Sequence, residues 1–111
     1  MTTIAAAAAA TIANGGATFA ADGTPVTEGF AVAGIAEAIR VDVADFTADL
    51  LAEVVALFAE AGTFGTWIED GEVWIEPSEV YTDRAEAERV ARQRDEIAFY
   101  DLTAGQEIRL R

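Results

Sequence analysis

Alternating apolar and polar residues on both sides of Asp70-Gly71 predict a β-hairpin over residues 64–76. The Asp-Gly pair favours the positive φ angles of a two-residue turn, which places Trp67 opposite Trp74. Because side chains alternate along a strand, Ile68, Val73 and Ile75 share the expected core face. The other face then carries Trp67, Glu69, Glu72, Trp74 and Glu76. Pro77 is expected to end the hairpin.

Apolar residues at helical spacing predict an amphipathic helix over residues 45–62. Asp42 or Asp45 would cap its start, and Gly62 would end it. Opposite the apolar side, acidic residues form an uncompensated stripe of like charge: Asp45, Asp49, Glu53 and Glu60. Like charges four residues apart destabilise a helix slightly, so the stripe is a candidate surface for a basic partner.

The remaining patterns complete an α+β architecture. The alanine-rich residues 3–13 read as a helix, although six consecutive alanines would also suit a tight strand or an interface. A capping box at 83–86 predicts a short helix to about residue 94, and residues 97–110 read as a second hairpin. We expect one domain over residues 1–111, with antiparallel hairpins forming a sheet and two or three helices packed on one face.

The residue inventory removes most enzyme chemistry. The chain has no His, Cys or Lys and one serine, Ser78, so the common general bases, nucleophiles and zinc ligands are missing. We therefore expect no catalytic residues, no cofactor and no metal site. A carboxylate-based enzyme or metal binder remains the weaker alternative, because twenty acidic residues offer many chance pairs.

The net charge of −13 belongs entirely to residues 1–83, which hold fourteen acidic residues and one arginine. Such a surface repels nucleic acid and anionic membranes and attracts basic protein surfaces. No apolar stretch approaches the roughly 20 residues that span a bilayer. The alanine-rich start has no basic region before it, so we expect no cleaved signal and a cytoplasmic location.

An exposed Trp67–Trp74 pair ringed by glutamates is typical of a protein interface, where aromatic anchors meet a charged rim. The sequence therefore favours a binding protein that presents the hairpin and the acidic helix to a basic protein. A structural alternative is a homo-oligomer, with subunit contacts through the alanine-rich N-terminus and the tryptophan hairpin. In a third interpretation, the acidity serves solubility alone.

Residues 73–110, "VWIEPSEVYTDRAEAERVARQRDEIAFYDLTAGQEIRL", resemble the C-terminal half of small uncharacterised accessory proteins of actinobacteria and their phages. The segment "NGGATFAADG" near the start adds to this resemblance. It implies an accessory protein from a GC-rich genome and transfers no reaction or site residue. In that setting, an acidic binding protein would block a basic, nucleic-acid-binding surface of a host protein.

Overall fold

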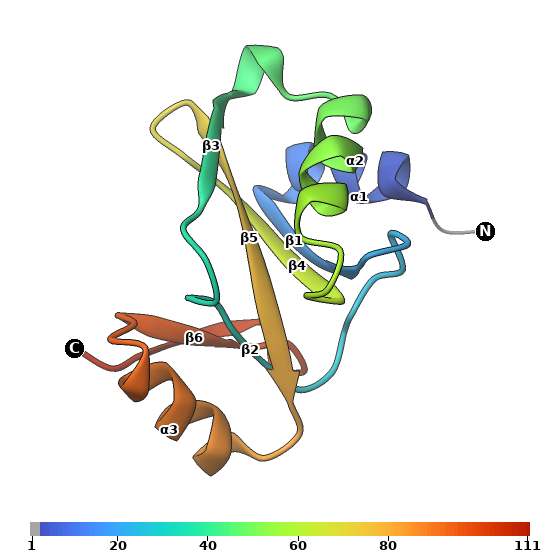
Figure 1. The fold of residues 1–111 in the computed structure, drawn as a ribbon. Coiled ribbons are helices and arrows are strands. Elements are labelled where there is room, and N and C mark those ends of the chain that lie inside the picture. Colours follow the sequence, from blue (N-terminus) through green and yellow to red (C-terminus); the bar gives the residue numbers. More distant parts are fainter. Residues whose placement is uncertain (1–2) are drawn as a thin grey trace.

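One long strand, β5, organises the fold (Figure 1). The computed structural model describes residues 3–111, and all strand pairs in it are antiparallel. The strands are β1 (Gly16–Ala20), β2 (Phe30–Val32), β3 (Ile39–Asp42), β4 (Thr63–Glu69), β5 (Glu72–Tyr81), β6 (Ala98–Asp101) and β7 (Gln106–Arg109). One edge of β5 pairs with β4, which in turn pairs with β1. The other edge pairs with β3 near its start and with β2 near its end, and β6 and β7 follow β2.

Two apolar cores lie against this sheet. The helices are α1 (Ile4–Asn14), α2 (Ala48–Leu57) and α3 (Arg84–Gln93), with a short 3₁₀ turn η1 (Val43–Asp45). In the first core, α1 and α2 pack on Val73 and Ile75 of β5, and in the second, α3 packs with Val32 and Phe99. Tyr81 alternates with Val73 and Ile75 along β5 and packs against the second core, so both helical layers lie on one face of β5. The predicted α+β fold is confirmed.

The central hairpin has the predicted register. Asp70 and Gly71 have φ angles of 52° and 77°, and Trp67 pairs directly with Trp74. However, the prediction that Pro77 ends the hairpin is wrong, because β5 continues to Tyr81. On the edge of β5 away from β4, β3 pairs as far as Ile75 and β2 only from Glu79. Within residues 3–111 no strand faces Pro77 there, so its missing N–H interrupts no ladder on that edge.

The long helix is shorter than the sequence pattern predicts. Thr47, not an aspartate, caps α2, because its Oγ1 accepts a hydrogen bond from Leu50 N at 3.1 Å. The helix ends at Leu57, where Phe58 leaves helical geometry and packs against the first core. Asp45 therefore lies in η1, and Glu60 lies in the turn after α2. The four-residue acidic stripe is reduced to Asp49 and Glu53 on the helix.

The alanine-rich segment forms α1, capped by Thr3 at its start and by Gly15 with φ 80° at its end. Its small side chains allow close packing, so Ala7, Ala8 and Thr11 are buried against the sheet and α2. This face of the segment belongs to the protein's own core.

The C-terminal predictions are also confirmed. Asp83 caps α3 by accepting from Ala85 N, and Gly105 has φ 68° in the turn between β6 and β7.

Candidate functional site

The face of the central hairpin that points away from α1 and α2 carries a cross-strand tryptophan pair. The ring centroids of Trp67 and Trp74 are 5.8 Å apart, with the rings tilted by 49°. Arg40 on β3 pairs with Trp74 on the other side, and its guanidinium carbon lies 4.8 Å from the ring centroid of Trp74, within cation–π range. Gly16 on β1 stands opposite Trp67 and adds no side chain, and Trp67 is 45% exposed.

Arg40, Trp74 and Trp67 lie side by side on three neighbouring strands and form the aromatic row. A row of three carboxylates, those of Asp42, Glu72 and Glu69, runs beside it, and each lies two residues from the aromatic-row member on its own strand. Glu72 is paired with Glu69 on β4 and with Asp42 on β3. Residues two apart on a strand share a face and lie ~7 Å from one another. No ion pair compensates this row within residues 3–111. The tip of the hairpin is therefore a strongly negative edge next to exposed aromatic surface.

Glu76 lies on the other side of the aromatic row and is partly buried. Burial raises the pKa of Glu76, and the nearby carboxylate of Glu96 raises it further. Opposite Glu76 stands Gly65, where an added Cβ would meet no atom within 4 Å. The sheet is open beside this carboxylate, and no arginine of residues 3–111 forms an ion pair with it.

Two buried polar atoms on the same face of β5 lack hydrogen-bond partners in the described chain: Trp74 Nε1 and Ser78 Oγ. Ser78 follows Glu76 by two residues and is only 3% exposed. An unpartnered buried polar group carries a desolvation penalty of about 1–3 kcal/mol. Such groups are uncommon in folded proteins, and two of them on one face of the same strand mark this face as unusual.

Trp67, Glu69, Trp74, Glu76 and Ser78 line a cleft of about 1080 Å³. One wall is the outer face of the hairpin with Gly16, and the opposite wall comes from β2, β6 and the segment that follows α3. Two arginines on that wall are engaged locally: Arg111 pairs with Asp95 at 3.2 Å, and Arg109 pairs with Glu107 at 3.4 Å. The cleft thus combines aromatic surface, uncompensated carboxylates and unpartnered polar atoms.

The structure brings together only some of the residues predicted from sequence. Trp67, Glu69, Trp74 and Glu76 all line the cleft, and Glu72 lies on the same face outside the lining. The acidic residues of the long helix do not join them. Because Leu51, Val54 and Val55 of α2 pack on Val73 and Ile75, Asp49 and Glu53 belong to the opposite side of the sheet. Asp45 and Glu60 flank α2 in sequence, and none of the four lines the cleft.

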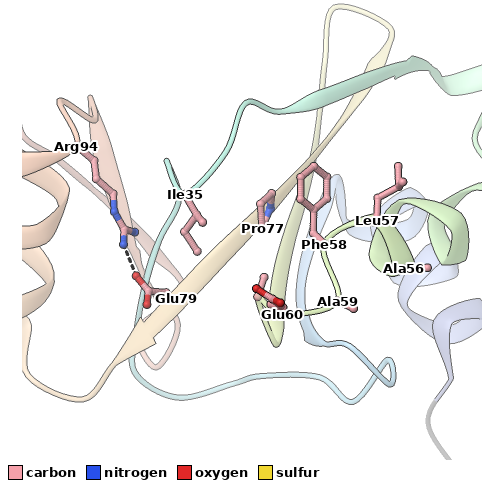
Figure 2. Close-up of a pocket in the computed structure, with 10 residues that line it drawn as sticks. Ile35, Ala56, Leu57, Phe58, Ala59, Glu60, Pro77, Glu79 and Arg94 are labelled. Carbon is pink, nitrogen blue, oxygen red and sulfur yellow. Dashed lines mark hydrogen bonds and ion pairs between the residues drawn. The ribbon is translucent and has the colours of Figure 1, made fainter.

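A second hollow, of about 620 Å³, lies on the helix side of β5 (Figure 2). Its lining includes Phe58, Pro77 and the exposed side chain of Leu57. At one end, Arg94 pairs with Glu79, as the dashed line in Figure 2 marks. Arg94 also donates to Ala33 O at 3.2 Å. Arg94 and Glu79 satisfy each other here, whereas the cleft on the opposite face combines aromatic surface with unpartnered polar atoms, so that cleft is the better candidate for a ligand.

Sequence reasoning missed Ser78, Glu96 and Asp42 as parts of the candidate site. Asp42 and Ser78 reach it through strand pairings that connect distant segments, and the continuation of β5 beyond Pro77 is needed to place Ser78. A serine two residues after Glu76 would have been a signal if the strand had been extended. Nothing in the sequence indicates that Glu96 faces Glu76.

No protein-family model, curated protein or solved structure matches this chain. Within residues 3–111, no group of three or more acidic side chains is arranged to hold a metal ion. The helices in that range are too short or too polar to cross a bilayer.

Proposed function

We propose that this protein is a non-catalytic binding module that recognises a basic protein surface through the cleft face of its central hairpin. The observation that carries the proposal is the Trp67–Trp74 pair, in which Trp67 is exposed and Trp74 half-buried on one wall of a cleft, bracketed by carboxylates that have no ion-pair partner in the described chain. Aromatic side chains anchor interfaces by burying large areas, and the surrounding charges select the partner.

Electrostatics supports a cationic partner. The chain has a net charge of −13, which attracts basic surfaces over long range and accelerates encounter at low salt. The carboxylate row of Asp42, Glu72 and Glu69 stands at the tip of the hairpin, next to Trp67. A partner that places lysine or arginine there would relieve the repulsion between neighbouring acids.

The resemblance to accessory proteins of actinobacteria and their phages supplies a biological version of the proposal. In that version, the protein occupies a nucleic-acid-binding surface of a host protein and blocks it. The face that carries the aromatic row and the carboxylate row suits a protein interface. It suits imitation of a nucleic-acid backbone less well, because a mimic of a phosphate backbone needs a longer row of charges. Asp49 and Glu53 alone on α2 are too few to provide one.

The test is affinity capture from a cell lysate of the source or host, at low and moderate salt, with matched variants. Trp67→Ser removes the exposed anchor, and the double change Glu69→Gln with Glu72→Gln removes two rim charges. Glu53→Gln on α2 is the control, because it removes a charge on the opposite side of the sheet. We expect a basic protein that the native chain and the control retain, and that both cleft-face variants lose by at least tenfold.

Light scattering on the same preparations tests the alternative of self-assembly. A stable oligomer that Trp67→Ser converts to monomer, without capture of any basic partner, would replace the proposed function with subunit contact through the hairpin. Partner binding that survives both cleft-face variants would also contradict the proposal. Circular dichroism confirms that each variant is folded.

A further inference from the structure

The cleft offers one cationic subsite built around Glu76. We propose that this subsite binds the side chain of a lysine within a peptide segment, with its ammonium group beside Glu76 and its alkyl chain against the Trp67–Trp74 pair. This inference rests on the proposed function and names the group of the basic partner that enters the cleft. It adds a specific chemistry that a general acidic surface would not provide.

The charges around Glu76 favour a cation there. Two carboxylates line this part of the cleft, Glu76 from β5 and Glu96 from the segment after α3, and the charge of Glu96 acts on Glu76. Burial also raises the pKa of Glu96, Asp95 acts in the same direction, and Arg94 and Arg111 act in the opposite one. The ion pairs of these two arginines are with Glu79 and Asp95 respectively, and within residues 3–111 neither arginine forms one with Glu76 or Glu96. An incoming ammonium group would offset the repulsion between Glu76 and Glu96.

A second observation points to the same place. Ser78 is 3% exposed, lines the cleft on the same face as Glu76, and has no hydrogen-bond partner within residues 3–111. Its hydroxyl oxygen could accept one N–H of an ammonium group. Because less than 1 Å² of Ser78 Oγ is accessible, a neighbouring side chain, such as that of Glu76, must rotate to admit the ligand. The open space at Gly65, opposite Glu76, leaves room for that rotation.

The unpartnered Trp74 Nε1–H, which like Ser78 Oγ has less than 1 Å² accessible and is reached only when a covering side chain moves, favours a peptide over a free amine. An indole N–H is only a donor, so it needs an acceptor that a polyamine does not have. A peptide provides main-chain carbonyl groups as well as the ammonium group of its lysine. Lysine fits better than arginine, because its compact ammonium carries three donors, and the acceptors here belong to three separate side chains, those of Glu76, Ser78 and Glu96.

Binding can be followed with NMR on ¹⁵N-labelled protein, since the chain has two tryptophans and thus two indole N–H signals. Trp67→Phe assigns them. The probes are acetyl-Gly-Lys-Gly-amide, its arginine and norleucine counterparts, and spermidine. We expect the lysine peptide to shift the Trp74 indole signal saturably, at least fivefold more tightly than the arginine peptide or spermidine, with no saturable shift from the norleucine peptide.

Two matched variants test the role of the carboxylate. Glu76→Gln keeps the shape of the side chain and should lower the affinity for the lysine peptide at least fivefold. Glu53→Gln, which removes the same charge from α2, should change the affinity less than twofold. If both variants lower the affinity equally, the effect comes from net charge alone, and the inference is overturned. Equal binding of spermidine or of the arginine peptide would overturn it as well.

The capture experiment separates this inference from the proposed function. If the lysine peptide causes no saturable shift while a basic partner is still lost in the Trp67→Ser variant, the lysine subsite is wrong and the binding function stands. If the partner is absent and the lysine peptide still binds at Glu76, the subsite stands and the protein-binding role is wrong.

Discussion

Thr11 Oγ1 lies 2.6 Å from Thr66 Oγ1 in the buried contact between α1 and β4. Thr11 also donates to Ala7 O at 2.9 Å, which uses its only hydroxyl proton. Because the alternative acceptor for the Thr66 hydroxyl, Ala17 O, is farther away at 3.5 Å, we assign Thr66 as the donor between the two hydroxyls. A chain of two hydrogen bonds thus joins the alanine-rich helix to the central hairpin.

This pair gives the first prediction. Thr11→Val leaves the buried Thr66 hydroxyl with only Ala17 O, at 3.5 Å, and should lower the free energy of unfolding by about 1–2 kcal/mol. The double variant Thr11→Val with Thr66→Val replaces both hydroxyls with methyl groups. Its loss in free energy of unfolding should be clearly smaller than the sum of the losses from the two single changes. Urea unfolding of the four proteins measures this coupling. Strict additivity would mean that the two hydroxyls do not interact.

The second prediction concerns Glu76 and pH. Its raised pKa means that the folded protein binds a proton more tightly than the unfolded chain. Stability should therefore fall as pH rises from about 4.5 through the pKa of the folded state. Glu76→Gln should reduce this decline and raise stability at pH 7 by up to about 1 kcal/mol. Urea unfolding between pH 4 and 8 measures it, and an unchanged slope in the variant would contradict the prediction.

The third prediction concerns Glu79, whose pKa is shifted in the opposite direction to that of Glu76. Its hydrogen bond with Arg94, and then that from Tyr81 OH at 3.0 Å, lower the pKa of Glu79. The stabilisation is present above about pH 4.5 and is lost as pH falls through the lower pKa of the folded state. Since the Glu79 side chain is 45% exposed, we expect Glu79→Gln to cost about 1 kcal/mol at pH 7. The difference from the native chain should shrink at pH 3, and a constant difference would speak against this origin.

The fourth prediction compares two glycines in left-handed backbone. A Cβ on Gly23, at φ 93°, would lie 2.2 Å from the carbonyl carbon of Thr3, the cap of α1. A Cβ on Gly62, at φ 79°, would meet no atom within 4 Å. Gly62→Ala should cost about 1 kcal/mol from backbone strain alone. Gly23→Ala should cost more than twice as much, because the cap must also move. Thermal unfolding monitored by circular dichroism decides between this outcome and equal losses.

The hairpin register could be predicted because its determinants are local. Asp70-Gly71 specifies the turn, and alternation then assigns every side chain to a face. The end of α2 could not be predicted, since residues 58–61 favour a helix by composition. Phe58 leaves the helix to pack against the core that β1, β4 and α1 assemble. Tertiary packing decides that boundary, and with it the positions of Glu60 and Leu57.

For the same reason, only part of the candidate site could be predicted from the sequence. The two tryptophans and their glutamates share one hairpin, so local alternation groups them. Asp42 and Glu96 come from segments that meet the hairpin only after the whole sheet has formed. The opposite placement of Asp49 and Glu53 follows from which face of β5 the apolar side of α2 covers. Sequence periodicity alone does not relate the outer side of a helix to one face of a distant hairpin.

β5 pairs with β3 and β4 in the half-sheet under α1 and α2, and with β2 in the half-sheet under α3. Because this one strand contributes to both half-sheets, the two cores cannot unfold independently. Opening the core under α3 removes the partners of Glu79 and Tyr81, and opening the core under α1 and α2 removes those of Val73 and Ile75. β5 is one continuous strand of ten residues, so loss of order in either part of it weakens the pairing of the other. The protein should therefore unfold as a single cooperative unit, and the cleft between the half-sheets should persist for as long as the molecule is folded.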